Sequence, residues 1–199
     1  MKKQKFTVDE NIVQELEAIN SRNENLSNSN LSKANLQNIN LVNCDIQNSD
    51  FSKANLENAS LYGANLKGCN LFKVNLKNAN LNNSNLENCN LLGANFENTK
   101  LRNVKWGKNY KVVNEIEAET AYKNKDYKLA KEKYKEAEDI YRAIKISMQS
   151  QTLGEETGQF FIREMIAKRK QFDRFSCSRI WSKIIEITTG YGEKLGNKK

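Results

Sequence analysis

Residues 64–96 read ANLKGCNLFKVNLKNANLNNSNLENCNLLGANF, and a large apolar residue returns at every fifth position of this stretch. We call this residue the centre of its pentad. Centres run without a break from Leu26 to Leu101, sixteen in all, and every one is Leu except Ile46, Phe51 and Phe96. A small residue stands two positions before most centres, and Asn or Asp stands directly before most of them.

A period of five fits neither regular element. Five residues turn an α-helix by about 500°, so successive centres would lie about 140° apart and encircle the helix. In an unbroken strand the side chains alternate with period two, so an odd spacing would send successive centres to opposite faces. The spacing works if each pentad is a short extended piece followed by a turn. We therefore expect the chain to coil around its centres.

The residue two positions after each centre supports such a turn, because it is Asn, Lys or Gly in all sixteen pentads. Asn and Gly tolerate a positive φ angle. The chain has no proline, so every backbone N–H can donate to a neighbouring coil. The sequence thus predicts a narrow solenoid with this structural core: Leu31, Leu36, Leu41, Ile46, Phe51, Leu56, Leu61, Leu66, Leu71, Leu76, Leu81, Leu86, Leu91, Phe96 and Leu101.

The pentads Ala54-Asn55-Leu56, Ala64-Asn65-Leu66 and Ala94-Asn95-Phe96 resemble the pentapeptide-repeat family, and the resemblance covers about residues 24–105. It implies a β-solenoid of one kind, a right-handed quadrilateral β-helix with four pentads per coil and about four coils. One branch of the family protects DNA gyrase by presenting an acidic, DNA-like rod. Residues 21–105 carry nine basic and six acidic groups, which argues against that mimicry.

Residue types needed for several chemistries are missing from the chain. It contains no His, so His-based triads and His metal sites are impossible, and it shows no phosphate-cradling glycine loop. Cys69 and Cys89 would lie one coil apart, which could suggest a metal or redox pair, but we favour small apolar fillers. We expect no catalytic residue, metal or cofactor, and we predict that the protein is not an enzyme.

Residues beyond the solenoid follow the period of a helix. Tyr127, Ala130, Tyr134, Ala137, Tyr141, Ile144 and Met148 form an apolar seam with alternating spacings of three and four. Another helix is expected around Phe160, Phe161, Met165 and Phe172, and a last one around Ile180, Trp181, Ile184, Ile185 and Ile187. The stretch AYKNKDYKLAKEKYKEA, residues 121–137, resembles part of a tetratricopeptide repeat. The resemblance implies an all-α, tetratricopeptide-like domain.

The chain therefore divides into an N-terminal capping helix (1–20), a pentapeptide-repeat β-helix (21–106) and a helical domain (107–199). Phe72 and Leu92 would stack on the solenoid surface, where they form a candidate partner surface or receive the C-terminal helices. The basic run Lys168, Arg169 and Lys170 is a candidate for weak contact with an anionic membrane, with a solvated helix end as the alternative.

The formal net charge is +8, and no stretch approaches the roughly 18 apolar residues that a membrane span needs. We expect a cytoplasmic protein, with membrane association as the alternative. Residues 137–172, followed by GYGEK, resemble a helical segment of pentapeptide-repeat membrane proteins in which such a module leads into channel-like spans.

Three functions follow. The first is a noncatalytic scaffold for protein–protein interaction, with an unknown protein partner and no nucleic acid. The second is the cytoplasmic portion of a channel-like membrane protein, cut short before its spans. The third is gyrase protection by DNA mimicry, which ranks last on charge.

Overall fold

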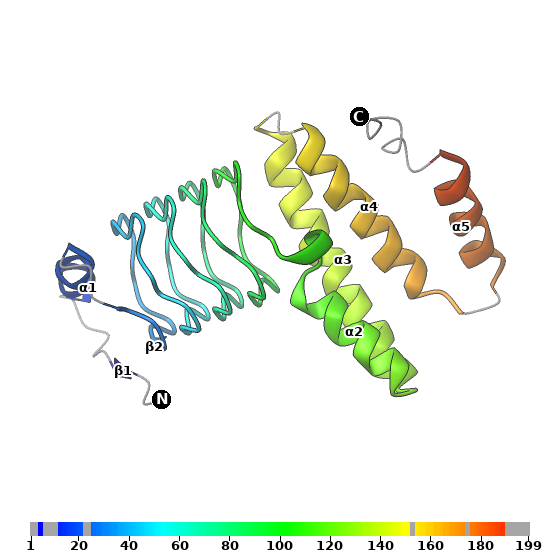
Figure 1. Cartoon of the computed structure of the whole chain (residues 1–199), viewed down its shortest axis with the longest axis horizontal. Helices are drawn as coiled ribbons and strands as arrows, with labels where there is room; N and C mark the ends of the chain where they lie inside the picture. The colour runs from blue at the N-terminus through cyan, green and yellow to red at the C-terminus, as the bar shows by residue number, and fades with distance from the viewer. Residues whose placement is uncertain (1–3, 6–11, 22–24, 152–153, 174–175, 190–199) are drawn as a thin grey trace. The chain divides into compact units, whose positions relative to one another are not determined.

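The computed structural model describes residues 4–5, 12–21, 25–151, 154–173 and 176–189. The chain folds as two compact units, Met1–Val113 and Asn114–Lys199 (Figure 1). The first unit holds the pentads, and the second is made of helices.

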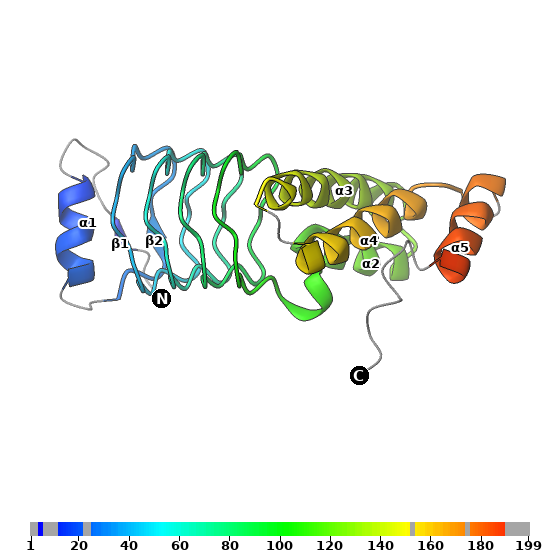
Figure 2. The ribbon, with the colours of Figure 1, turned by 90° about the horizontal axis from the view of Figure 1, so that it is seen from above.

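The pentads form a solenoid whose coils repeat every 20 residues. Isolated parallel β-bridges join residues 20 positions apart, from Asn30↔Asp50 to Asn85↔Lys105. Each coil therefore takes four pentads, and Figure 2 shows the coils stacked along the unit. The bridges stay isolated because a turn follows each extended piece, so the pentads of the described residues form no long-stranded sheet.

The turn predicted after each centre is confirmed. The residue two positions beyond the centre has a positive φ in every pentad, between 54° and 73° for Asn28 through Asn103. The backbone N–H of the next residue closes the turn, as when Ala54 N donates to Phe51 O over 2.9 Å. A positive φ at the third turn position alone defines a type II turn. Lys33, Lys53 and Lys73 also adopt this angle, so the coil imposes it on side chains that disfavour it.

In the pentad of residues 54–58, every backbone N–H finds an acceptor. Two bonds stay close in sequence, Ala54 N to Phe51 O and Glu57 N to the Asn55 side-chain oxygen, at 2.9 and 3.2 Å. Three cross to neighbouring coils: Asn55 N to Ala34 O (2.9 Å), Leu56 N to Asn75 O (2.8 Å) and Asn58 N to Lys77 O (2.9 Å). The coil thus satisfies its donors without long strands.

The Asn that precedes most centres has two roles. Its oxygen accepts from the backbone two residues on, and its amide donates to the Asn one coil earlier, as in Asn75 to Asn55 (3.0 Å) and Asn95 to Asn75 (3.1 Å). These ladders serve turns and stacking.

The solenoid interior is dry and narrow. The predicted core residues are at most 3% exposed: Leu31, Leu36, Leu41, Ile46, Phe51, Leu56, Leu61, Leu66, Leu71, Leu76, Leu81, Leu86, Leu91, Phe96 and Leu101. The small residues two positions before the centres are buried beside them. Cys69 Sγ donates to Ile46 O (3.1 Å) and Cys89 Sγ to Leu66 O (3.0 Å), so both cysteines lie in the wall as fillers.

Helix α1 (Ile12–Ser21) covers the first coil (Figure 2). Its Ile12 and Leu16 are buried, and Glu17 accepts a 2.7 Å bond from Asn40 N. Strand β1 (Gln4–Lys5) pairs in parallel with β2 (Ser29–Asn30), where we expected helix within residues 1–20. A strand of two residues is too short to show an alternating pattern in the sequence. Residues 1–3 and 6–11 of the expected capping segment lie outside the described residues.

The last pentads lead into a short 3-10 turn, η1 (Lys108–Tyr110), and then into α2 (Val113–Lys123). Trp106 is 4% exposed within the first unit. Helix α3 (Tyr127–Gln149) begins after Asp126, whose side chain accepts from Leu129 N over 3.0 Å.

Helix α3 packs along α4 (Gly154–Lys170), and α5 (Cys177–Thr189) follows. The predicted seam of α3 is buried from Ala130 to Met148, but Tyr127 is 58% exposed because it begins the helix. Phe172 lies beyond the end of α4 and is 37% exposed, so it does not belong to the α4 face on which we placed it.

The burial of three cysteines generates a testable difference in reactivity. Burial raises the pKa of Cys44 and Cys69 to about 12 and the pKa of Cys89 well above its usual value. Because the thiolate is the reactive form, we expect iodoacetamide near neutral pH to modify only exposed Cys177 in the native chain. Mass spectrometry after native and urea-unfolded labelling checks this. A Cys177→Ser variant is the control, and native modification of Cys69 or Cys89 would contradict the packed interior.

Candidate binding pocket in the helical unit

The helical unit contains a pocket of about 400 Å³ between helices. Its walls come from α2, α3, the end of α4 and the start of α5. The lining residues are Tyr122, Tyr127, Ala130, Lys131, Tyr134, Lys170, Gln171, Phe172, Asp173 and Arg179. Aromatic rings and cations dominate this set.

The aromatic wall follows from helical spacing on α3. Ala130 and Tyr134 are four residues apart, so they share one face, and they are 2% and 3% exposed. Tyr122 and Tyr127 meet edge to face, with ring centroids 5.3 Å apart. Burial, followed by the nearby carboxylate of Glu119, raises the pKa of Tyr134 to about 12, so this phenol keeps its proton at neutral pH.

The cations Lys131, Lys170 and Arg179 line the same pocket against one carboxylate, Asp173. Lys170 is half-buried, and burial lowers its pKa, with further lowering by the like charges of Arg179 and Arg169. Arg179 Nη1 donates to Phe172 O over 3.0 Å. Within the described ranges no carboxylate forms an ion pair with Lys170 or Arg179, so the pocket carries an excess of positive charge.

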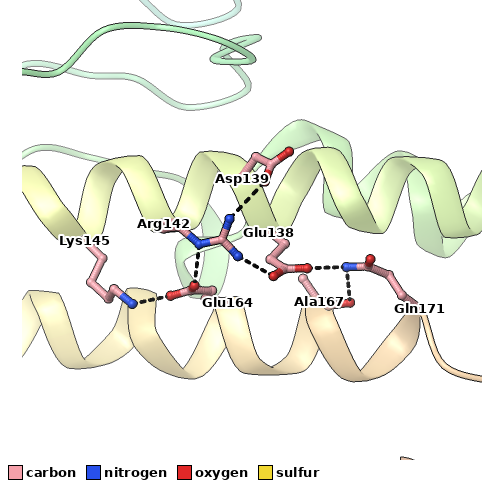
Figure 3. A network of polar contacts seen from close by, with 7 residues as sticks. All are labelled: Glu138, Asp139, Arg142, Lys145, Glu164, Ala167 and Gln171. Atoms are coloured by element: carbon pink, nitrogen blue, oxygen red, sulfur yellow. Dashed lines mark hydrogen bonds and ion pairs between the residues drawn. The ribbon is translucent and has the colours of Figure 1, made fainter.

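A polar network holds α4 against α3 (Figure 3). Glu164 of α4 is buried and accepts from two cations of α3, Arg142 Nε at 3.1 Å and Lys145 Nζ at 2.5 Å. Glu138 of α3 accepts from Arg142 Nη2 and, at 2.6 Å, from Gln171 Nε2. Gln171 is also a pocket residue, so the network fixes the wall where α4 ends.

A second buried carboxylate ties α2 into the unit. Glu115 is 1% exposed and accepts from Tyr141 Oη over 2.5 Å and from Arg163 Nη1 over 3.3 Å. Tyr141 belongs to α3 and Arg163 to α4, so the Glu115 side chain links α2 to both of these helices. The elements that supply Tyr122, Tyr134 and Lys170 are therefore held in place without a ligand.

The basic run that we proposed as one surface does not form one. Lys168 is exposed, Arg169 is 6% exposed and pairs with Glu186 of α5, and Lys170 faces the pocket. Consecutive helical residues point about 100° apart, which separates the three side chains. This corrects the expected basic patch.

Phe72 and Leu92 occupy the same position of neighbouring coils, and both are half-buried. The Lys73 ammonium lies 5.1 Å from the centroid of the Phe72 ring and covers part of it. The Lys73 side chain therefore covers part of the Phe72 surface that a partner would contact.

Sequence reasoning did not assemble the pocket. Tyr134 was identified only as a seam residue, and Arg179 and Asp173 lie in segments whose periodicity carries no signal. The rings of Tyr122 and Tyr127 meet across the turn at residues 124–126. The stretch AYKNKDYK, residues 121–128, predicts this contact only once the position of the turn is known.

The apolar residues expected to pack α5 are instead exposed. Ile180, Trp181, Ile184 and Ile187 are between 42% and 65% exposed, while Glu186 pairs with Arg169 of α4. Among the helices described, none combines the length and the apolar character needed to cross a bilayer. The segment GYGEK lies outside the described residues.

Comparison with known proteins gives a match to one family. The model of a family described as pentapeptide repeats matches residues 20–48, 39–78 and 69–105. No curated protein matches the chain.

Solved structures of pentapeptide-repeat proteins are similar to part of the chain. Rfr23 from Cyanothece 51142 is 42% identical over 45% of this chain and 60% of its own, with a TM-score of 0.43. The protein alr5209 from Nostoc PCC 7120 is 26% identical over 56% of this chain and 93% of its own, also with a TM-score of 0.43. QnrB1, a plasmid-mediated fluoroquinolone resistance protein, is 27% identical over 40% and 38%, with a TM-score of 0.26. The chain thus spans three fifths of the length of Rfr23.

The network of Figure 3 predicts a large effect of Glu164→Ala. Removal of the Glu164 carboxylate leaves Arg142 and Lys145, both partly buried, without the acceptor that they share. We therefore expect the free energy of unfolding to fall by about 2–4 kcal/mol. Urea unfolding followed by the helical circular dichroism signal measures it. The control Asp139→Ala removes a half-exposed partner of the same Arg142 and should change stability by less than about 1 kcal/mol. Equal effects of both substitutions would contradict the assigned role of Glu164.

Proposed function

We propose that this chain, whose residues 20–105 belong to the pentapeptide-repeat family, is a noncatalytic scaffold that binds another protein through the pocket of its helical unit. The observation that carries the proposal is the pocket itself. It joins exposed aromatic rings to cations that form no ion pair within the described part of the chain, on walls fixed by buried polar networks.

Aromatic residues and arginine are the side chains on which protein interfaces depend most. Tyr127 is 58% exposed although its ring meets that of Tyr122, so it offers ring surface to a partner. A pocket that is already formed loses little conformational freedom when a partner docks. Both features support binding of a protein segment.

The noncatalytic part of the proposal rests on the pocket's chemistry. Its lining holds one carboxylate, Asp173, and neither a hydroxyl–base pair nor a second carboxylate for acid–base work. The pKa of Tyr134 is raised to about 12, so this phenol is an even poorer source of a phenolate base at neutral pH than an ordinary tyrosine. We keep the expected cytoplasmic location as part of this proposal.

The tetratricopeptide-like character of the helical domain is also part of the proposal. A three-residue turn, 124–126, separates α2 from α3, and Ala121, Ala130 and Ala137 are buried as small packing residues. These features support a helical-repeat type of partner binding.

A relative of channel-like membrane proteins is a second candidate, favoured by one observation. The exposed Ile180, Trp181, Ile184 and Ile187 of α5 give that helix an apolar face suited to a membrane interface or to a further segment. Gyrase protection stays third, because the excess of basic groups over residues 21–105 has the wrong sign for DNA mimicry.

The scaffold proposal predicts that Tyr122→Ala/Tyr127→Ala abolishes partner binding. The tagged full-length chain and this variant are compared in pull-downs from native lysate, and the captured protein is then purified and titrated against both by calorimetry. We expect saturable binding to the unmodified chain and a loss of at least about tenfold in the variant. Tyr62→Ala, which removes an exposed ring of the solenoid, is the control and should bind normally.

Equal binding by the double variant would contradict the pocket as the binding site. Turnover of a metabolite by the purified chain would contradict the noncatalytic assignment.

A further inference from the structure

We propose that the pocket recognises an acidic peptide segment, with a carboxylate of the peptide held by Lys170 and Arg179 and an apolar side chain of the peptide against the rings of Tyr122 and Tyr127. This inference rests on the proposed function and specifies its partner chemistry.

Lys170 and Arg179 both line the pocket, and within the described residues neither side chain forms an ion pair with a carboxylate. Lys170 ends α4 and Arg179 lies in the first turn of α5, and each acts on the other as a like charge. The neighbouring Arg169 differs, because it has Glu186 as its partner. In the portion of the chain that the structure describes, the carboxylates that influence Lys170, Glu115 and Glu119, act at a distance and form no ion pair with it.

This arrangement of charges is unfavourable when no ligand is bound. A half-buried lysine loses hydration, and the adjacent guanidinium groups repel it, so burial and like charge both lower its pKa. An anion between Lys170 and Arg179 would reverse the repulsion and replace the lost hydration with charge-assisted hydrogen bonds. Arg179 is already oriented, because Nη1 donates to Phe172 O over 3.0 Å and the rest of its planar group stays available.

The apolar part of the pocket indicates a peptide rather than a bare anion. Tyr122 and Tyr127 form a ring pair beside the cations, and the cavity of about 400 Å³ exceeds what one small anion fills. Nucleic acid needs an extended cationic surface along its backbone. Here the cations converge on one concave site that also contains Asp173, and Lys168 lies apart from it.

The test uses the full chain and three fluorescein-labelled pentapeptides in anisotropy titrations. The first has the sequence Glu-Asp-Phe-Glu-Asp, the second replaces its acids with Gln and Asn, and the third replaces its Phe with Ala. We expect the first to bind at least about tenfold more tightly than either of the others, because charge-assisted bonds and ring contact each contribute. A single-stranded oligonucleotide and inorganic phosphate serve as competitors and should displace the peptide weakly.

The decisive variant is Lys170→Met, which keeps the aliphatic stem and removes the charge. We expect it to weaken binding of the acidic peptide at least about tenfold and to raise the Tm of the free chain, because a repelled, half-buried charge is removed. Lys168→Met, two residues earlier on the same helix and exposed, is the matched control and should change neither. A purely structural role of Lys170 would lower Tm instead.

Three outcomes would overturn the inference: equal binding of the acidic and amide peptides, unchanged binding by Lys170→Met, or displacement of the peptide by phosphate or oligonucleotide at equal concentration. The captured partner separates this inference from the proposed function. If Tyr122→Ala/Tyr127→Ala abolishes its binding while Lys170→Met does not, the pocket binds protein but not through acidic groups. If neither variant affects it, the proposed function fails as well.

Discussion

The solenoid depends on one backbone constraint, a left-handed residue at every fifth position. The positive φ after each centre bends the chain, so that four short pieces close one coil and the next coil begins 20 residues later. In residues 54–58 the turns place the N–H groups opposite acceptors that are close in sequence or lie in an adjacent coil. Burial of the centres and the side-chain ladders of Asn both follow from this closure. A coil that did not turn at each pentad could bury its leucines only by leaving backbone groups without partners.

The helical unit is organised by buried charge rather than by apolar packing alone. Glu115 and Glu164 each bind partners from other helices, and removing one partner of such a group is far more harmful than never burying it. These contacts fix the relation of α2, α3 and α4, and with it the pocket wall at Gln171. Among the described residues no carboxylate forms an ion pair with Lys170, which directly precedes Gln171 of this network. Arg169 and Lys170 are neighbours on α4, but only Arg169 forms an ion pair in the part of the chain that the structure describes. This difference is why we propose a binding role for Lys170 and a structural role for Arg169.

Particular residues show how far sequence reasoning reaches. The period of five predicts the turns and the interior, because each pentad repeats the same local chemistry and any error would appear sixteen times. The pocket has no such redundancy. Arg179 and Asp173 reach it through the bend after α4, and the direction of Lys168, Arg169 and Lys170 depends on where that helix lies. The exposure of the apolar face of α5 could not be predicted for the same reason. The spacing of apolar residues shows that a helix has an apolar face, but it does not show which element covers that face.

The stride of the solenoid can be measured by disulfide trapping in a chain whose native cysteines are replaced by Ser or Ala. Asn55 and Asn75 are bridged in parallel, and adjacent strands about 4.8 Å apart satisfy the distance that a disulfide requires. Asn55→Cys/Asn75→Cys should therefore oxidise to an intramolecular disulfide, detected as a loss of two hydrogens by mass spectrometry. Asn55→Cys/Asn70→Cys should stay reduced under the same conditions. Oxidation of the second pair and not of the first would mean three pentads per coil and would contradict the four-sided coil.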